Sequence, residues 1–237
     1  MSLVVREVGP GAVDVWEGRV LAAGGGWAWL RTRRGPVHLT GERGPLTPVT
    51  ARVGRVPALA PADRVRLDPS RARVWRTEPP PQPAPEAMIR DACAAVRVHL
   101  WNDPRALSLG ATPFDESVQA LAGRGPGLTP AGDDVLLGWM LARRAVAHPS
   151  WRHEAAAILR AARSTTTTPS RALLLWGSRG QAPEVAAAAL SALLAADGAA
   201  LAPAVRGLRG FGRTTGPAIL TGLVVALTAG GQAPPNR

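Results

Sequence analysis

The segment GPGLTPAGDD, residues 125–134, carries three glycines, one threonine and two adjacent aspartates immediately before an apolar run at 135–146. An apolar run of this kind predicts a buried helix, whose first N–H groups lack internal partners and carry a partial positive charge. Glycines there allow left-handed turns and a close approach to a ligand. The junction therefore predicts an anion site. The residues that we expect to contact the ligand are Gly125, Gly127, Leu128, Thr129 and Gly132.

Asp133 and Asp134 admit two interpretations. Either carboxylate could be an N-cap that accepts from the backbone two or three residues later. Alternatively, the pair could supply hard oxygen ligands for Mg²⁺ or a general base for catalysis. The sequence leaves both interpretations open, and it keeps both aspartates as candidate catalytic and metal-binding residues.

A second segment, GFGRTTGPAILTGL at 210–223, repeats the order of glycines and threonine and then enters another apolar run. Gly125, Gly127, Thr129, Gly132 and Gly138 align with Gly210, Gly212, Thr214, Gly216 and Gly222 after one gap. Two such turns facing each other would form one anion-binding cleft with two helix N-termini. The alternative is that Gly138 and Gly222 only let two helices pack closely. The second segment adds the candidates Arg213 for catalysis and Thr214, Thr215 and Gly216 for ligand binding.

A hydroxyl-rich segment, STTTTPS at 164–170, lies between the two glycine motifs. Its ordinary role is to start a helix, with Thr168 as the N-cap and Pro169 at the first helical position. Alternatively, Thr167, Thr168 and Ser170 could donate hydrogen bonds to the anion in the cleft.

The run from Gly127 to Asp134, followed by an apolar helix, resembles the signature of the AllH-type family. That family is a domain of unknown function linked to a subunit of oxamate carbamoyltransferase from anaerobic allantoin degradation, a branch of purine catabolism. The segment at 210–223 is similar to the family's C-terminal pattern, with three departures. Arg213 stands at the usual His, Thr215 at the usual Ser, and Ala218 where an Asp is frequent.

The resemblance implies an N-terminal β-rich part, a helical part, and a carbamoyl-phosphate or oxalurate-like ligand. It also implies other protein subunits, because the activity is assigned to a multi-subunit assembly. The chain could thus be a carbamoyltransferase subunit that stabilises the leaving phosphate through Arg213 and the loop N–H groups. The alternative is a non-catalytic ligand-sensing or scaffold subunit that relies on a partner for turnover.

Composition excludes several other classes. All 28 basic residues are arginine and the formal net charge is +11, so a lysine-dependent phosphate loop is absent. The arginines are spread along the chain and no nucleic-acid motif accompanies them, so nucleic acid is not the expected partner. The single Cys93 cannot form an internal disulfide and fits a small buried residue in a reducing cytoplasm. The four histidines lack zinc-site spacing. No run reaches the length of a membrane span, and no secretion signal is visible.

The elements that must position these residues change character along the chain. Residues 1–78 favour short strands around Val13 and Val15 and at 20–22, 27–30 and 37–39, bounded by glycine turns. A hairpin is predicted between Val65 and Val74, with its turn at Pro69. This part predicts a small barrel or sandwich.

The proline-rich run at 79–85 predicts an extended linker between two domains. Beyond it, residues 86–231 predict a mostly helical domain. The helices are expected at 86–101, 115–122, 134–147, 151–162, 170–176, 183–196 and 217–228. The sequence therefore predicts an α+β protein with the candidate site on its helical domain.

Overall fold

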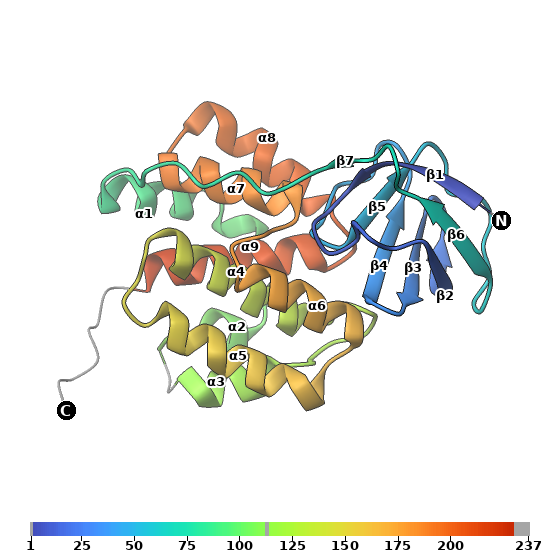
Figure 1. Cartoon of the computed structure of the whole chain (residues 1–237). Helices are drawn as coiled ribbons and strands as arrows, with labels where there is room; N and C mark the ends of the chain where they lie inside the picture. The colour runs from blue at the N-terminus through green and yellow to red at the C-terminus, as the bar shows by residue number, and fades with distance from the viewer. Residues whose placement is uncertain (1, 112–113, 230–237) are drawn as a thin grey trace.

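The computed structural model describes residues 2–111 and 114–229. It places a β-barrel beside a larger helical part, as the sequence predicted (Figure 1). The strands are β1 (Ser2–Val8), β2 (Glu17–Gly24), β3 (Trp27–Thr32), β4 (Gly35–Thr40), β5 (Thr50–Val53), β6 (Arg64–Asp68) and β7 (Arg73–Val74).

The barrel has six strands, because the sheet order β5-β4-β3-β2-β6-β1-β7 is closed by a further pairing of β5 with β1. Closure leaves β7 outside the ring, where β1 is its one partner strand in the described part of the chain. Alternate residues of each strand point inward, as the period of two requires. Leu30, Leu39 and Val65 are fully buried in the barrel's own hydrophobic cluster. The predicted glycine turn between β2 and β3 is confirmed at Gly25 and Gly26. The turn between β3 and β4 lies at Arg33 and Arg34, because Gly35 and Pro36 already pair with β3 as the first residues of β4.

The predicted hairpin at Val65–Val74 is wrong. The turn at Pro69 forms, with Asp68 accepting from the Ser70 N–H at 3.0 Å. The strands on either side of it do not pair with each other, because β6 and β7 each run parallel to a different part of β1. The strand expected around Val13 and Val15 is also wrong, since Val13 lies in a turn and Val15 in an irregular segment before β2. Strands β1 and β5 were not predicted.

The helical part surrounds two apolar helices. Its elements are α1 (Glu86–Ala95), the 3₁₀ turn η1 (Arg97–His99), α2 (Pro104–Leu107), α3 (Phe114–Leu121), α4 (Ala131–Ala145), α5 (Trp151–Thr165), α6 (Thr168–Gly177), α7 (Glu184–Ala195), α8 (Gly198–Arg209) and α9 (Thr215–Thr228). Each of the seven predicted helices is present. The first is shorter than predicted, because α1 ends at Ala95 and the chain continues as η1.

Helices α2 and α8 were not predicted. Helix α8 contains Pro203 in its interior and glycines at 198 and 207, which argue against a helix when read locally. Its buried residues Leu201, Val205 and Leu208 nevertheless follow the i, i+4, i+7 spacing of an amphipathic helix. Burial of that face against the rest of the helical part outweighs the poor local propensity.

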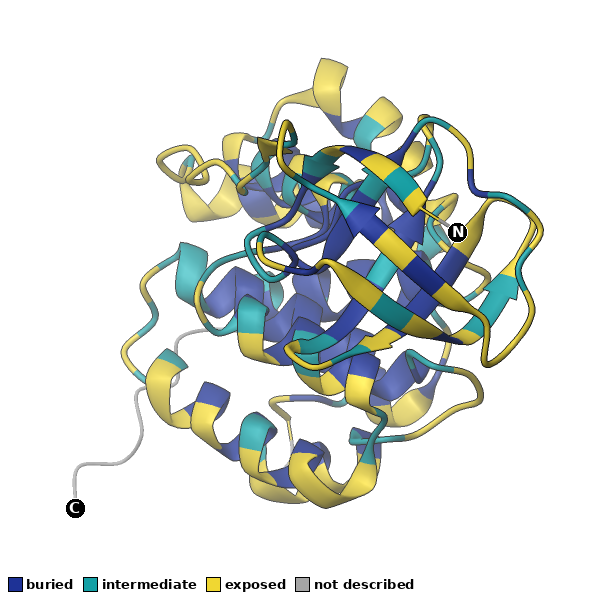
Figure 2. Ribbon diagram, turned by 45° about the vertical axis from the view of Figure 1, so that its right-hand side comes forward, coloured by how far each residue is buried: buried dark blue, intermediate teal, exposed yellow. Residues whose placement is uncertain are grey.

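Helices α4 and α9 cross at the centre of the helical part, where Figure 2 shows the ribbon dark blue. Every residue of α4 from Ala131 to Arg143 is buried. A β-carbon on Gly138 would lie 2.2 Å from the Ile219 carbonyl oxygen, and one on Gly222 would lie 2.0 Å from the Val135 carbonyl oxygen. The expectation that these two glycines permit close helix packing is therefore confirmed.

The proline-rich segment runs in extended form from β7 along the helical part to α1 (Figure 1). The Thr77 hydroxyl donates to the Ala182 carbonyl oxygen at 3.1 Å, and the Ala84 N–H donates to the Leu194 carbonyl oxygen at 2.7 Å. Residues 230 and 231 of the predicted helical domain lie outside the described residues. Among the helices that the structure describes, none has the length and apolar character needed to cross a bilayer.

Candidate functional site

The two glycine–threonine loops meet in the folded chain. The Thr129 and Thr215 hydroxyl oxygens are 3.2 Å apart, although 86 residues separate them in sequence. Together the loops line one side of a cavity of about 540 Å³. The barrel forms the opposite side, through residues of β2, β3 and β4 and of the loop that follows β4.

The loops present backbone N–H groups that have no internal partner. Within the described chain, the backbone N–H groups at 127–129 and 212–215 form no hydrogen bond. Gly127 and Gly212 lie in the left-handed region, with φ of +96° and +66°, which turns successive N–H groups toward one side. Arg213 also lines the cavity, is exposed, and forms no ion pair with any described residue. This side of the cavity is suited to an anion.

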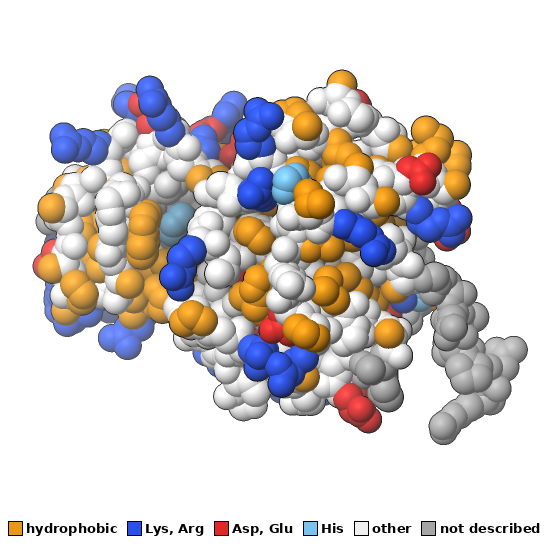
Figure 3. Space-filling view, turned by 180° about the vertical axis from the view of Figure 1, so that it is seen from behind, with side chains coloured by type: hydrophobic (Ala, Val, Ile, Leu, Met, Phe, Trp, Pro, Cys, Tyr) orange, Lys and Arg blue, Asp and Glu red, His pale blue; other side chains and the backbone are white. Residues whose placement is uncertain are grey.

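The barrel side carries aromatic residues that sequence reasoning missed. Trp27, Trp29 and His38 line it, and the Trp29 and His38 rings lie against each other, tilted by 37° with centroids 5.0 Å apart. Figure 3 shows apolar side chains and one histidine where the barrel meets the helical part. No local signal marks these residues, because they lie in strands whose only sequence feature is alternation.

His38 is neutral at pH 7. Burial lowers the pKa of its imidazole to about 4, because a charged ring loses hydration there. Its Nδ1 lies 3.5 Å from the Thr50 hydroxyl. A neutral imidazole can accept or donate a hydrogen bond without adding charge, so His38 offers the cavity a polar contact that stays uncharged near neutral pH.

Asp133 is held by three protein donors. Its Oδ1 accepts from the Gly123 N–H at 2.8 Å, and its Oδ2 accepts from the hydroxyls of Thr166 and Ser170. The carboxylate is almost completely buried, with 1% of its surface exposed. It therefore joins the start of α4 to the chain before it and to the start of α6, which fixes the first loop from behind.

Asp134 has a different environment. Its Oδ2 is buried without a hydrogen-bond partner in the described chain. Burial raises the pKa of this carboxyl well above its ordinary value of 3.8, the neighbouring Asp133 raises it further, and the Thr215 hydroxyl opposes the shift. The neutral form of Asp134 is thus favoured in the folded chain.

The N-cap interpretation of the two aspartates is wrong. Helix α4 begins at Ala131 with Pro130 as its N-cap, so both aspartates lie inside the first turn, and no side chain caps this helix. The pair also does not fit a Mg²⁺ site. The oxygens of Asp133 are taken by protein donors, and among the described residues no third His, Cys, Asp or Glu side chain joins the pair to complete a ligand set.

Three predicted ligand-binding glycines support the loops and do not line the cavity. A β-carbon on Gly132 would lie 2.0 Å from the Leu121 carbonyl oxygen, and one on Gly216 would lie 1.7 Å from the Leu208 carbonyl oxygen. Each glycine thus lets the start of one helix contact the end of the preceding helix. Gly125 turns the chain at a φ of +114°.

The hydroxyl segment lies behind the first loop. Thr167, and not Thr168, is the N-cap of α6, accepting from the Ser170 N–H at 3.2 Å. The prediction was wrong by one residue, because Pro169 occupies the second helical position and not the first. The Thr167 hydroxyl also donates to the Leu128 carbonyl oxygen at 2.5 Å. Thr168 is exposed and accepts from Arg171, so it contributes nothing to the cavity.

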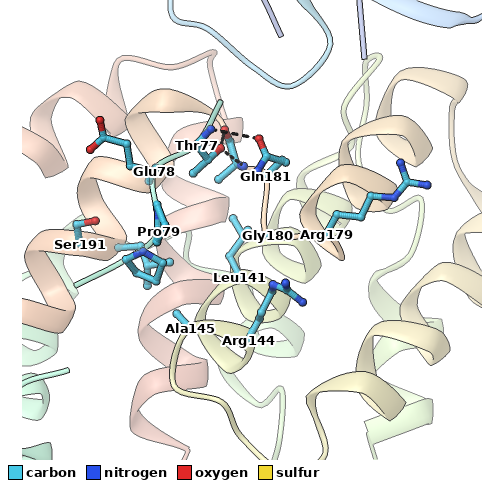
Figure 4. A pocket seen from close by; sticks show the side chains of 14 residues that line it. Thr77, Glu78, Pro79, Leu141, Arg144, Ala145, Arg179, Gly180, Gln181 and Ser191 are labelled. Atoms are coloured by element: carbon cyan, nitrogen blue, oxygen red, sulfur yellow. Dashed lines mark hydrogen bonds between the residues drawn. The ribbon is translucent and has the colours of Figure 1, made fainter. Parts of the chain in front are cut away.

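A second cavity of about 280 Å³ lies under the proline-rich segment (Figure 4). Arg144 and Arg179 border it, and Thr77 is hydrogen-bonded to Gln181 at its rim. None of the predicted site residues lines it. Among the described residues, no group of three or more His, Cys, Asp or Glu side chains is placed to hold a metal ion.

Comparison with known proteins found one match, to a family model that covers part of the helical region. No curated protein and no solved structure matches the chain. A family model does match, over residues 121–227, a range that begins at the end of α3 and includes both glycine–threonine loops and most of α9. The barrel lies outside the matched range. The resemblance seen in the sequence is confirmed: over residues 121–227 this chain carries the pattern of the family described as oxamate carbamoyltransferase subunit AllH.

Proposed function

We propose that this chain is a ligand-binding subunit of a carbamoyltransferase assembly and that the cavity between barrel and helices binds its small anionic substrate. The family match supports a relation to such a subunit. The observation that carries the proposal is the meeting of both loops at one cavity, with Arg213 and a series of free N–H groups on the same side. Carbamoyl phosphate and oxalurate are anions of the kind that these donors recognise.

The donors of the two loops would each bind a different part of the anion. Arg213 would neutralise the charge of a phosphate or carboxylate, since its guanidinium offers paired donors to such groups. The N–H groups at 127–129 and 212–215 would bind the remaining oxygens. The hydroxyls of Thr129, Thr214 and Thr215 would complete the contacts. Charge stabilisation and orientation are the main requirements for carbamoyl transfer with a phosphate leaving group.

A second candidate function is binding without catalysis, in which a partner subunit supplies the reactive groups. One observation favours it: no carboxylate is found among the described residues that line the cavity. Asp133 is engaged by structural donors and Asp134 is buried behind Thr215. Among the described lining residues, the neutral imidazole of His38 is the side chain that could accept a proton, and its pKa of about 4 makes it a weak base.

The first experiment is to measure thermal stability with carbamoyl phosphate, phosphate, oxamate or oxalurate, each with and without Mg²⁺. A ligand that binds only the folded state raises stability by RT ln(1 + [L]/Kd). We expect one or more of these anions to raise the thermal midpoint selectively. Arg213→Gln should raise the Kd of that anion about tenfold or more, because a hydrogen bond to a charged group contributes about 1.5–3 kcal/mol. Arg206→Gln, an exposed arginine of α8 outside the cavity, is the matched control.

Two results would contradict the proposal. The first is the absence of a shift with any of the four anions. The second is an equal loss of binding in Arg206→Gln and Arg213→Gln, which would indicate general charge attraction. Turnover assays of the purified chain, alone and with its partner subunits, then separate a catalytic subunit from one that only binds.

A further inference from the structure

A row of arginines crosses the outer face of the barrel. In the strand register, Arg19 of β2 lies opposite Arg31 of β3 on one side and opposite Arg64 of β6 on the other. Neighbouring strands are about 4.8 Å apart, so the three arginines occupy adjacent backbone positions on the sheet. Arg66 projects from the same face two residues after Arg64, and Arg33 follows just beyond the end of β3.

These five arginines have no ion-pair partner in the described chain, and all are exposed. Elsewhere on the barrel, arginines do pair with acids, as Arg6 does with Glu42 and Arg52 with Glu7. Like charges directly opposite each other on paired strands destabilise a sheet. The isolated barrel therefore carries an unfavourable arrangement that an anionic partner would relieve.

The arginine groove is defined here as the groove of about 490 Å³ that Arg19, Arg31, Arg33, Arg64 and Arg66 line. It shares no residue with the cavity between barrel and helices. An adjoining groove continues from it past Trp16, whose side chain is 57% exposed. Figure 3 shows several blue side chains along the outer edge of the barrel. The sequence hid this concentration, because the five arginines come from three separated segments.

We propose that the arginine groove is a docking site for an acidic segment of a protein partner. Arginine and tryptophan are the residues most enriched among those that dominate binding energy at protein interfaces. Carboxylates of the partner would pair with the row at the spacing of the strands, as Arg–carboxylate geometry allows. The proposal concerns the barrel and does not depend on which ligand the cavity binds.

A protein fits this groove better than a nucleic acid for two reasons. Glu17 lies inside the groove, opposite Arg66 in the register, and would repel a continuous phosphate backbone. A protein surface can instead place a basic residue against Glu17. In addition, none of the described residues that line the arginine groove is aromatic, so these residues offer no stacking platform of the kind that single-stranded nucleic acid uses.

The test uses the full chain and a fluorescein-labelled glutamate 12-mer, with binding followed by anisotropy at several salt concentrations. The triple variant Arg19→Gln/Arg31→Gln/Arg64→Gln is compared with Arg160→Gln/Arg206→Gln/Arg209→Gln, which removes the same charge from exposed helical positions. We expect the groove variant to lose at least tenfold in affinity and the control to lose less than threefold. The groove variant should also have a higher thermal midpoint, because like charges have been removed from the row.

Three outcomes would overturn the proposal. The peptide fails to bind the unmodified chain at low salt, or both triple variants lose the same affinity. The third outcome is that a labelled single-stranded oligonucleotide of equal length binds more tightly than the peptide and depends on the same three arginines, which would identify the groove as a nucleic-acid site.

Discussion

Gly138 and Gly222 each lie against the backbone of the other's helix, and the two contacts are reciprocal. The added β-carbon of Gly138 would meet Ile219 and Leu223, while that of Gly222 would meet Val135 and Trp139. The sequence repeat is therefore a structural repeat, in which α3 and α4 correspond to α8 and α9. Because the two copies cross at their glycines, the loops before α4 and α9 are brought to the same cavity.

Substitution of either crossing glycine should strongly destabilise the helical part. In Gly138→Ala or Gly222→Ala the new methyl group meets main-chain atoms at about 2 Å, and a backbone cannot move aside as a flexible side chain can. We expect a loss of about 3 kcal/mol or more, at the upper end of overpacking effects. Denaturant unfolding measures it.

The control for this prediction is Gly207→Ala in α8. Its added β-carbon would have only an ordinary contact, 4.0 Å from Val185. Alanine is a better helix former than glycine, so this variant should gain up to about 1 kcal/mol. Equal effects at Gly207 and Gly138 would show that helix propensity, and not the crossing, decides the outcome.

Removal of the Asp133 carboxylate should destabilise the chain, because the start of α4 would lose its hydrogen bonds to the segments that hold the first loop. Asp133→Ala leaves the buried Ser170 hydroxyl and the partly buried Gly123 N–H and Thr166 hydroxyl without their acceptor. An unsatisfied buried group costs about 1–3 kcal/mol, so a loss of about 3 kcal/mol is expected in the free energy of unfolding. Asp91→Ala removes an exposed carboxylate from α1 and should change stability by less than about 0.5 kcal/mol. A wild-type thermal midpoint in Asp133→Ala would contradict this role.

Asp134 should make the folded chain less stable as pH rises. The pKa of Asp134 is higher in the folded chain than its ordinary value of 3.8. At a pH between these two values, the carboxyl is ionised in the unfolded chain and protonated in the folded chain. Stability therefore declines with rising pH over that range. Asp134→Asn keeps the shape without the ionisation and should remove this decline, which urea unfolding at pH 5 and pH 7 can measure. An unchanged pH slope would show that Asp134 is ionised in the folded chain.

His38 should make the folded chain less stable as pH falls, which is the opposite of the effect expected from Asp134. Its folded pKa of about 4 lies below its ordinary value of 6.5, so the unfolded chain binds a proton first as pH falls. The stability associated with neutral His38 is present above pH 6.5 and is lost between about pH 6.5 and 4. His38→Gln should flatten the stability profile in that window, whereas exposed His153→Gln should not. Similar profiles for the two variants would contradict burial as the cause.

Glu154 should be the acidic residue whose loss affects α4 and α5 most. It accepts from Trp139 Nε1 at 2.9 Å, from Arg143 Nη2 at 2.9 Å and from the Ser150 hydroxyl at 2.6 Å. Glu154→Ala would leave a buried guanidinium without its partner, and a loss of about 3–5 kcal/mol is expected. Calorimetric unfolding measures the change. An effect below 1 kcal/mol would mean that solvent reaches Arg143 in the folded chain.

The sequence by itself determined those features that depend on local chemistry. The apolar runs at 135–146 and 217–228 can be stable in water only as buried helices, and both are present as α4 and α9. The glycine turns of the barrel, the proline-rich extended segment and the burial of Cys93 also followed from residue type. The repeated glycine pattern was visible, and with it the expectation of close helix packing.

Only the tertiary structure decided which side chains meet. Asp133 and Asp134 are neighbours in sequence, yet one is bound by three donors and the other is buried without a partner for one oxygen. The parallel pairing of β6 and β7 with β1, the place of His38 in the cavity and the arginine row depend on strand register. Register is set by closure of the whole barrel and burial of its core, which act between residues far apart in the chain, so no local pattern contains it.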